Sequence, residues 1–133
     1  ESRATARAWA TSPAARELGV ELLRPPAAEH WQELSASRFM LLPLEQHIQS
    51  SSMVEALLVL TIPIVQRGAF PTHDDLVDMG FPIVVVDRWS EVTAAKLAEW
   101  SRKLSPRLES FRRNCLTTGA YWKMITGSMT RCE

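Results

Sequence analysis

The 133-residue chain lacks a net charge, because its 15 lysines and arginines balance its 15 aspartates and glutamates. A neutral chain has no electrostatic reason to bind nucleic acid or an anionic membrane, so we expect no nucleic-acid partner. The length suits one domain, which would bury about two thirds of the surface that its unfolded chain exposes.

Long apolar runs are also missing, since none approaches the roughly 20 residues that span a bilayer. The first ten residues lack the apolar core of a signal peptide. We therefore expect any anchor or targeting signal to lie outside this chain. A first residue Glu1 in place of methionine is consistent with a fragment or a processed product.

Cysteine is scarce, and Cys115 and Cys132 are the only two. Two cysteines near one end form neither a zinc cluster nor a disulfide framework. Two interpretations stay open: a pair of unpaired thiols, or one disulfide. With no internal repeat and no linker, residues 1–133 are expected to form a single, partial Rossmann-like domain with its core at 19–104 and a helical segment at 105–127.

Strand-like and helical patterns alternate along the chain. Four short apolar runs predict strands, at 19–23, 39–42, 62–65 and 83–86. Helical spacing of apolar residues predicts helices at 1–18 (interrupted at Pro13), 27–35, 53–60, 73–79, 90–104 and 106–125. Ser50 to Ser52, Thr72 and Ser90 are expected N-caps, and Gly80 is an expected C-terminal stop. The alternation predicts an α/β fold, with a parallel sheet of about four strands flanked by helices.

The most informative segment is 39–65, FMLLPLEQHIQSSSMVEALLVLTIPIV. It has the pattern of strand, loop, amphipathic helix and strand, which is one parallel βαβ unit. Ligands of parallel sheets bind at the carboxyl ends of strands, so the loop 44–52 is where we expect chemistry.

This segment resembles the nucleotide-sugar-binding domain of exostosin-like GT-B glycosyltransferases. In that family a strand ending in proline leads through a loop to a Trp-Glu-Ala-Leu helix and an Ile-Pro-Ile-Val strand. The resemblance resumes in the run from Phe81 to Val86 and in DRWSEVT at 87–93, where the family has a similar Trp-Ser-Glu-(Val/Ile)-Thr helix start. About half of the chain is well covered.

The resemblance implies the later part of a Rossmann-like domain, and thus the donor-binding half of a glycosyltransferase. Such an enzyme would transfer a sugar, with inversion, from a nucleotide-sugar donor to a glycan or glycoprotein acceptor. A further N-terminal glycosyltransferase domain would hold the acceptor, and a Golgi or other secretory lumen would be the location. Glu55 matches the glutamate of the signature and is expected to accept hydrogen bonds from the ribose hydroxyls.

The loop before Glu55 departs from the family pattern, because residues 44–52 contain neither the glycines nor the arginine that hold a diphosphate. Ser51 and Ser52 offer hydroxyls and free N–H groups at a helix start. His47 is a candidate general base, although an exposed loop histidine is more often simply solvated.

Asp87 follows the last strand, where ligands bind, although it could simply end that strand and help to cap the next helix. The adjacent acids Asp74 and Asp75 are more simply read as first-turn acids than as a metal site, so we expect no metal and no tightly bound cofactor. The catalytic residues remain unassigned. Two functional hypotheses stay open: a glycosyltransferase donor half, or a degenerate, non-catalytic domain of the same kind that serves as a scaffold or binding module.

Overall fold

The computed structural model describes residues 2–23, 25–44 and 51–133. Their centre is a parallel sheet of three strands in the order β1-β2-β3, formed by Phe39–Leu42, Ile62–Gln66 and Val84–Val86. Phe39 lies opposite Ile62, and Ile64 lies opposite Val84. The expected α/β fold with a parallel sheet is therefore confirmed, although the sheet has three strands.

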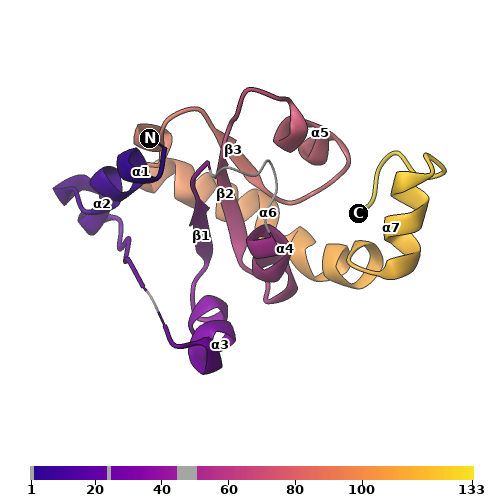
Figure 1. Cartoon of the computed structure of the whole chain (residues 1–133), viewed down its shortest axis with the longest axis horizontal. Helices are drawn as coiled ribbons and strands as arrows, with labels where there is room; N and C mark the ends of the chain where they lie inside the picture. The colour runs from indigo at the N-terminus through magenta and orange to yellow at the C-terminus, as the bar shows by residue number, and fades with distance from the viewer. Residues whose placement is uncertain (1, 24, 45–50) are drawn as a thin grey trace.

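Helices surround this sheet (Figure 1). They are α1 (Ser2–Ala10), α2 (Pro13–Glu17), α3 (His30–Ser35), α4 (Ser51–Leu58), α5 (Thr72–Asp78), α6 (Ala94–Cys115) and α7 (Thr118–Ile125), with 3-10 turns at Ala27–Glu29 and Trp89–Glu91. In Figure 1, α4 lies in front of the sheet and α6 crosses behind it, while α1 and α2 lie at the end of the molecule opposite α7. The N-terminal helix is interrupted at Pro13, as expected.

The expected strand at 19–23 is wrong, because Gly19 ends a helix and the residues after it form no ladder. Gly19 has φ of 79° and donates its N–H to the Arg16 carbonyl, while Val20 donates to the Ala15 carbonyl. These two bonds form a Schellman motif, in which glycine adopts the left-handed conformation at no steric cost. The glycine that was assigned to a strand is thus the C-terminal cap of α2.

The helix boundaries near β3 also differ from the expectation. Residues Trp89–Glu91 form a 3-10 turn, and α6 begins after Thr93, whose hydroxyl accepts the Lys96 N–H at 3.2 Å. Ser90 is therefore not the cap. Pro106 lies inside α6 and does not begin a new helix. Leu104 before it packs partly buried against the core, and Leu108 and Phe111 after it are buried, so packing on both sides maintains the helix despite the missing proline N–H.

Other expected caps are corrected as well. Thr72 is the first residue of α5 and makes no capping hydrogen bond, while Gly80 ends that helix with φ of 102°, as expected. Ser51 and Ser52 are helical residues of α4, and Ser50 lies outside the described residues. Leu60 follows α4 in the left-handed conformation, with φ of 62°, which an ordinary side chain adopts only at a cost of about 1–2 kcal/mol.

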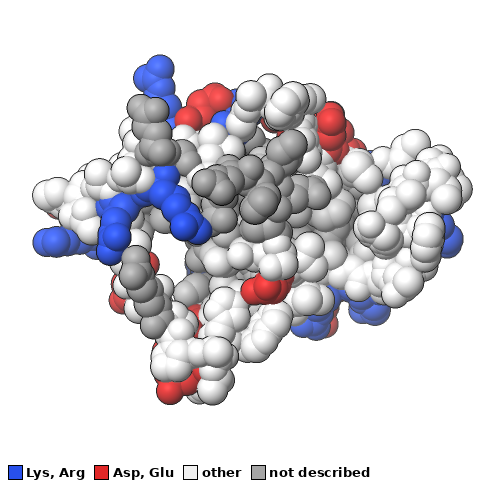
Figure 2. Space-filling view, viewed as in Figure 1, with Lys and Arg blue, Asp and Glu red and all other residues white. Residues whose placement is uncertain are grey.

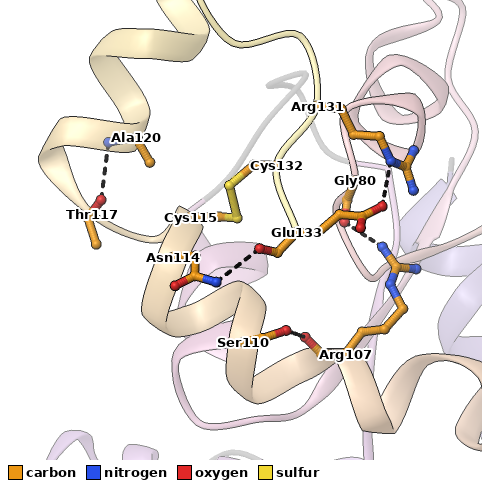
Figure 3. The surroundings of a disulfide bond; sticks show 10 residues. All are labelled: Gly80, Arg107, Ser110, Asn114, Cys115, Thr117, Ala120, Arg131, Cys132 and Glu133. Atoms are coloured by element: carbon orange, nitrogen blue, oxygen red, sulfur yellow. Dashed lines mark hydrogen bonds and ion pairs between the residues drawn. A yellow bond between two sulfur atoms is a disulfide. The ribbon is translucent and has the colours of Figure 1, made fainter.

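The two cysteines are joined, which decides between the interpretations left open. Cys115, the last residue of α6, is bonded to Cys132, and both are buried (Figure 3). Around this disulfide, the Cys132 N–H donates to the Met79 carbonyl at 2.8 Å and Asn114 donates to the Glu133 carbonyl at 3.1 Å. The C-terminal segment is therefore fastened to both α5 and α6.

Candidate functional site

The carboxyl edge of the sheet is the first place to search for a site. Leu44 lies just beyond β1, Arg67 follows β2 and Asp87 follows β3. The segment after β2 contacts the segment after β1, since a Cβ built on Gly68 would lie 3.2 Å from Leu44 Cδ2. The loops at this edge are therefore close neighbours.

Glu55 lies in the second turn of α4, and its carboxylate is part-buried. Its Oε2 is 3.0 Å from Nε2 of His30, the first residue of α3. The second carboxylate oxygen, Oε1, has no hydrogen-bond partner among the described residues, so it retains acceptor capacity. The imidazole fixes one oxygen of this carboxylate and leaves the other available.

Arg67 is the centre of a charged cluster. Its Nε and one terminal nitrogen donate to the two carboxylate oxygens of Asp74, at 2.9 and 3.0 Å, and its other terminal nitrogen donates to Asp87. These contacts join the ends of β2 and β3 to α5, in the forked geometry that suits a guanidinium. Hydrogen bonding from Arg67 lowers the pKa of Asp74 below its usual value, and the two carboxylates raise the pKa of Arg67.

The segment after β3 is held by its own backbone contacts. The N–H groups of Asp87 and Arg88 both donate to Oε2 of Glu91, each at 2.7 Å. Trp89, the residue after Arg88, is buried and stacks on Trp9 of α1 with ring centroids 6.1 Å apart. The Trp-Ser-Glu part of the motif thus has a structural role here: tryptophan closes the core and glutamate binds the turn.

The candidate residues are placed as follows. Ser51 and Ser52 lie in the first turn of α4, one turn before Glu55, so these three share the start of one helix. Asp87 directly follows β3 and is bound to Arg67, and it makes no hydrogen bond with the described residues of α4. His47 lies outside the described residues. The structure therefore places the described candidates in two separate groups, one on α4 and one after β3.

Two partners were missed from the sequence. His30 is 25 residues from Glu55, and no local pattern connects them. Arg67 carried a usable signal, because it directly follows a predicted strand and so lies at the edge where ligands bind.

Burial lowers the pKa of His73 below its usual value. Among the described residues, no group of three or more His, Cys, Asp or Glu side chains is placed to hold a metal ion. None of the helices in the described ranges is long and apolar enough to cross a membrane. Comparison with protein-family models, curated protein sequences and solved structures finds no match to this chain.

Proposed function

We propose that this chain is the donor-binding part of a glycosyltransferase of the exostosin-like GT-B kind. The enzyme would move a sugar from a nucleotide-sugar donor to a glycan or glycoprotein acceptor. The resemblance at 39–65 supports this, because that segment folds as the β1-α4-β2 unit. The second segment of resemblance supplies β3 and the turn after it, beside β2 in the same sheet.

The observation that carries the proposal is the position of Glu55. It lies near the start of the helix that follows β1, with one carboxylate oxygen held by His30 and the other unpartnered among the described residues. A carboxylate fixed in this way is suited to accept hydroxyl donors from a ribose. His30 would act by orienting Glu55, and the serine hydroxyls one turn earlier would add donors beside a helix N-terminus.

The donor half alone is not expected to complete the transfer. In the proposed arrangement, the acceptor is held by an N-terminal glycosyltransferase domain, and inversion takes place between the two domains. We assign no catalytic residue to this chain.

The buried disulfide between Cys115 and Cys132 bears on the location. Structural disulfides form and persist in oxidising compartments. This is consistent with the secretory lumen that the resemblance implies, and we propose the Golgi or another part of that lumen as the site of action.

A second function is favoured by the charge cluster at the sheet edge. The guanidinium of Arg67 is already neutralised there by Asp74 and Asp87, and residues 44–52 contain no arginine or glycine. Arg67 therefore offers a diphosphate no uncompensated positive charge. The alternative is therefore a glycosyltransferase-like domain that no longer binds a donor and serves as a scaffold or binding module.

The substitution Glu55→Gln separates the two. It retains size and packing, but replaces one carboxylate oxygen with an amide donor. If Glu55 holds a ribose, the affinity for a nucleoside diphosphate should fall by about 1–3 kcal/mol, as for loss of a charged acceptor. Isothermal titration with uridine and guanosine diphosphates and their sugars measures it.

Glu109→Gln is the matched control, since Glu109 is an exposed carboxylate on α6. The control should bind like the unmodified chain. Equal affinity of the Glu55 variant would remove Glu55 from the site. Absence of binding by the unmodified chain would favour the scaffold.

A further inference from the structure

β1 is one of the two edge strands of the sheet, since it pairs only with β2, as β3 does on the opposite side. The Arg38 carbonyl accepts the Ile62 N–H at 2.9 Å, so the alternation of a strand turns the backbone groups of Phe39 and Leu41 away from β2. Neither residue forms a backbone hydrogen bond with a described residue on that side. Two N–H groups and two carbonyl groups of this apolar strand thus point away from β2.

A groove of about 950 Å³ runs along this edge. Its walls are β1, the extended segment after α2, the start of α3 and one side of α1. Across from β1, Leu22 and Leu23 are about half exposed, at 55% and 51%. Trp89 also belongs to the lining, and its buried indole N–H has no hydrogen-bond partner. The groove therefore combines apolar walls with unsatisfied polar groups.

Charged side chains of both signs line the groove. Among its described lining residues are Arg7 on α1 and Arg38 just before β1, together with Glu21 and Glu33. In Figure 2, basic side chains gather at the rim of a hollow on the side of the N-terminal helices. Arg38 is exposed and directly precedes β1, so a carboxylate of the occupant can pair with it beside the strand.

We propose that this groove binds an extended polypeptide segment, which adds a strand to the edge of β1. Unpaired edge groups recognise the backbone of such a segment, and the pockets beside a strand take its alternate side chains. The occupant has apolar residues facing Leu22 and Leu23 and an acidic residue beside Arg38. β1 has none of the charges, prolines or bulges that protect an edge against pairing, until Pro43 ends it.

A recessed edge favours a single strand over a second copy of the domain. Both α1 and the segment after α2 stand beside β1 as walls of the groove, so a whole sheet edge of another copy cannot approach as closely as one strand. The occupant is accordingly a peptide segment, and self-association is an outcome that the test must detect.

The test uses Leu41→Pro with Leu41→Ala as its matched control. Proline removes the N–H that faces the groove, and an edge strand tolerates proline at such a position. Alanine removes the same side chain but retains the N–H. Peptides selected from a phage-displayed library of random 12-residue sequences against the unmodified chain should lose about tenfold or more affinity on Leu41→Pro, and much less on Leu41→Ala.

Two further measurements keep the proposal open to refutation if the proline variant does not fold. In the unmodified chain, a selected peptide should slow hydrogen exchange of the Phe39 and Leu41 amides. Arg38→Gln should weaken binding several-fold, by an amount that shrinks as salt is raised. No enriched peptide, equal binding to the two Leu41 variants, unchanged exchange, or a dimer at β1 in sedimentation would each overturn the proposal.

Discussion

The strands β1 and β2 are similar in length and in apolar character, yet their environments differ. β2 is covered on both faces and paired on both edges, and Ile62 and Ile64 have no exposed surface. Every residue of β1 is only partly buried, and one of its edges faces the groove. Position in the sheet, and not composition, therefore determines the burial of these two strands.

The same contrast extends to the elements around them. On the side of β2 and β3, the Arg67 cluster joins strand ends to α5, and the disulfide fastens the C-terminus to α6. On the side of β1, the segment after α2 crosses without a ladder hydrogen bond. The disulfide and the Arg67 cluster thus support the side of β2 and β3, whereas the outer edge of β1 has no partner strand among the described residues.

The largest expected effect comes from removing the disulfide. Replacing Cys115 and Cys132 together with alanine should lower the free energy of unfolding by about 3 kcal/mol, because the bond closes a loop of 17 residues in the unfolded chain. Urea denaturation followed by circular dichroism measures this difference. Adding a reductant to the unmodified chain in denaturant should reproduce this loss. A loss below about 1 kcal/mol would show that the disulfide contributes little to the stability of the fold.

The second prediction compares two glycines that cap helices on opposite sides of the molecule. A Cβ on Gly80 would lie 2.0 Å from the Cys132 carbonyl oxygen, whereas a Cβ on Gly19 would meet nothing within 4 Å. Both have positive φ, so alanine costs about 1 kcal/mol at either position.

At Gly80 the displaced carbonyl should bring the loss in unfolding free energy to about 2 kcal/mol or more. Thermal or urea unfolding of the two alanine variants provides the comparison. Equal losses would contradict the tight contact between α5 and the C-terminal segment.

The smallest effect concerns pH. The pKa of Asp74 is lowered in the folded chain, chiefly by its hydrogen bonds with Arg67. Its contribution to stability is therefore present above its ordinary pKa of 3.8, and is lost as pH falls through the lower folded value. Asp74→Asn should remove this part of the acid dependence, while Asp75→Asn, next to it, should not.

Unfolding midpoints between pH 2 and pH 6 test the difference. Identical pH profiles for the two asparagine variants would show that the Arg67 cluster does not stabilise the fold. Because these side chains are well exposed, high salt should reduce the effect.

Much of the fold could be predicted from periodicity. The β1-α4-β2 unit and β3 follow from short apolar runs and helical spacing, which depend only on local sequence. The strand expected at 19–23 failed because Gly19 and Val20 complete hydrogen bonds to α2, and apolar residues after a helix do not by themselves supply a pairing partner. The helix start predicted at Pro106 was also wrong, because tertiary packing of α6 outweighs the one hydrogen bond that proline removes.

The candidate site was harder to predict. The positions of Glu55, in the predicted helix between two strands, and of Asp87, directly after a predicted strand, followed from the sequence pattern. Their partners did not, since the contact of His30 with Glu55 and that of Arg67 with Asp87 join residues 25 and 20 positions apart. Whether the two cysteines form a disulfide could not be predicted either, because the sequence alone does not indicate whether their Cα atoms lie within bonding range.

The most direct test of the central claim is an NMR titration of the unmodified chain with uridine and guanosine diphosphates and their sugars, observed residue by residue. The account predicts saturable shifts at Ser51, Ser52 and Glu55 and at the turn after β3, with no shift at Phe39 and Leu41 on the open edge. A folded chain whose spectrum does not change with any of these nucleotides would contradict the proposed donor half-site.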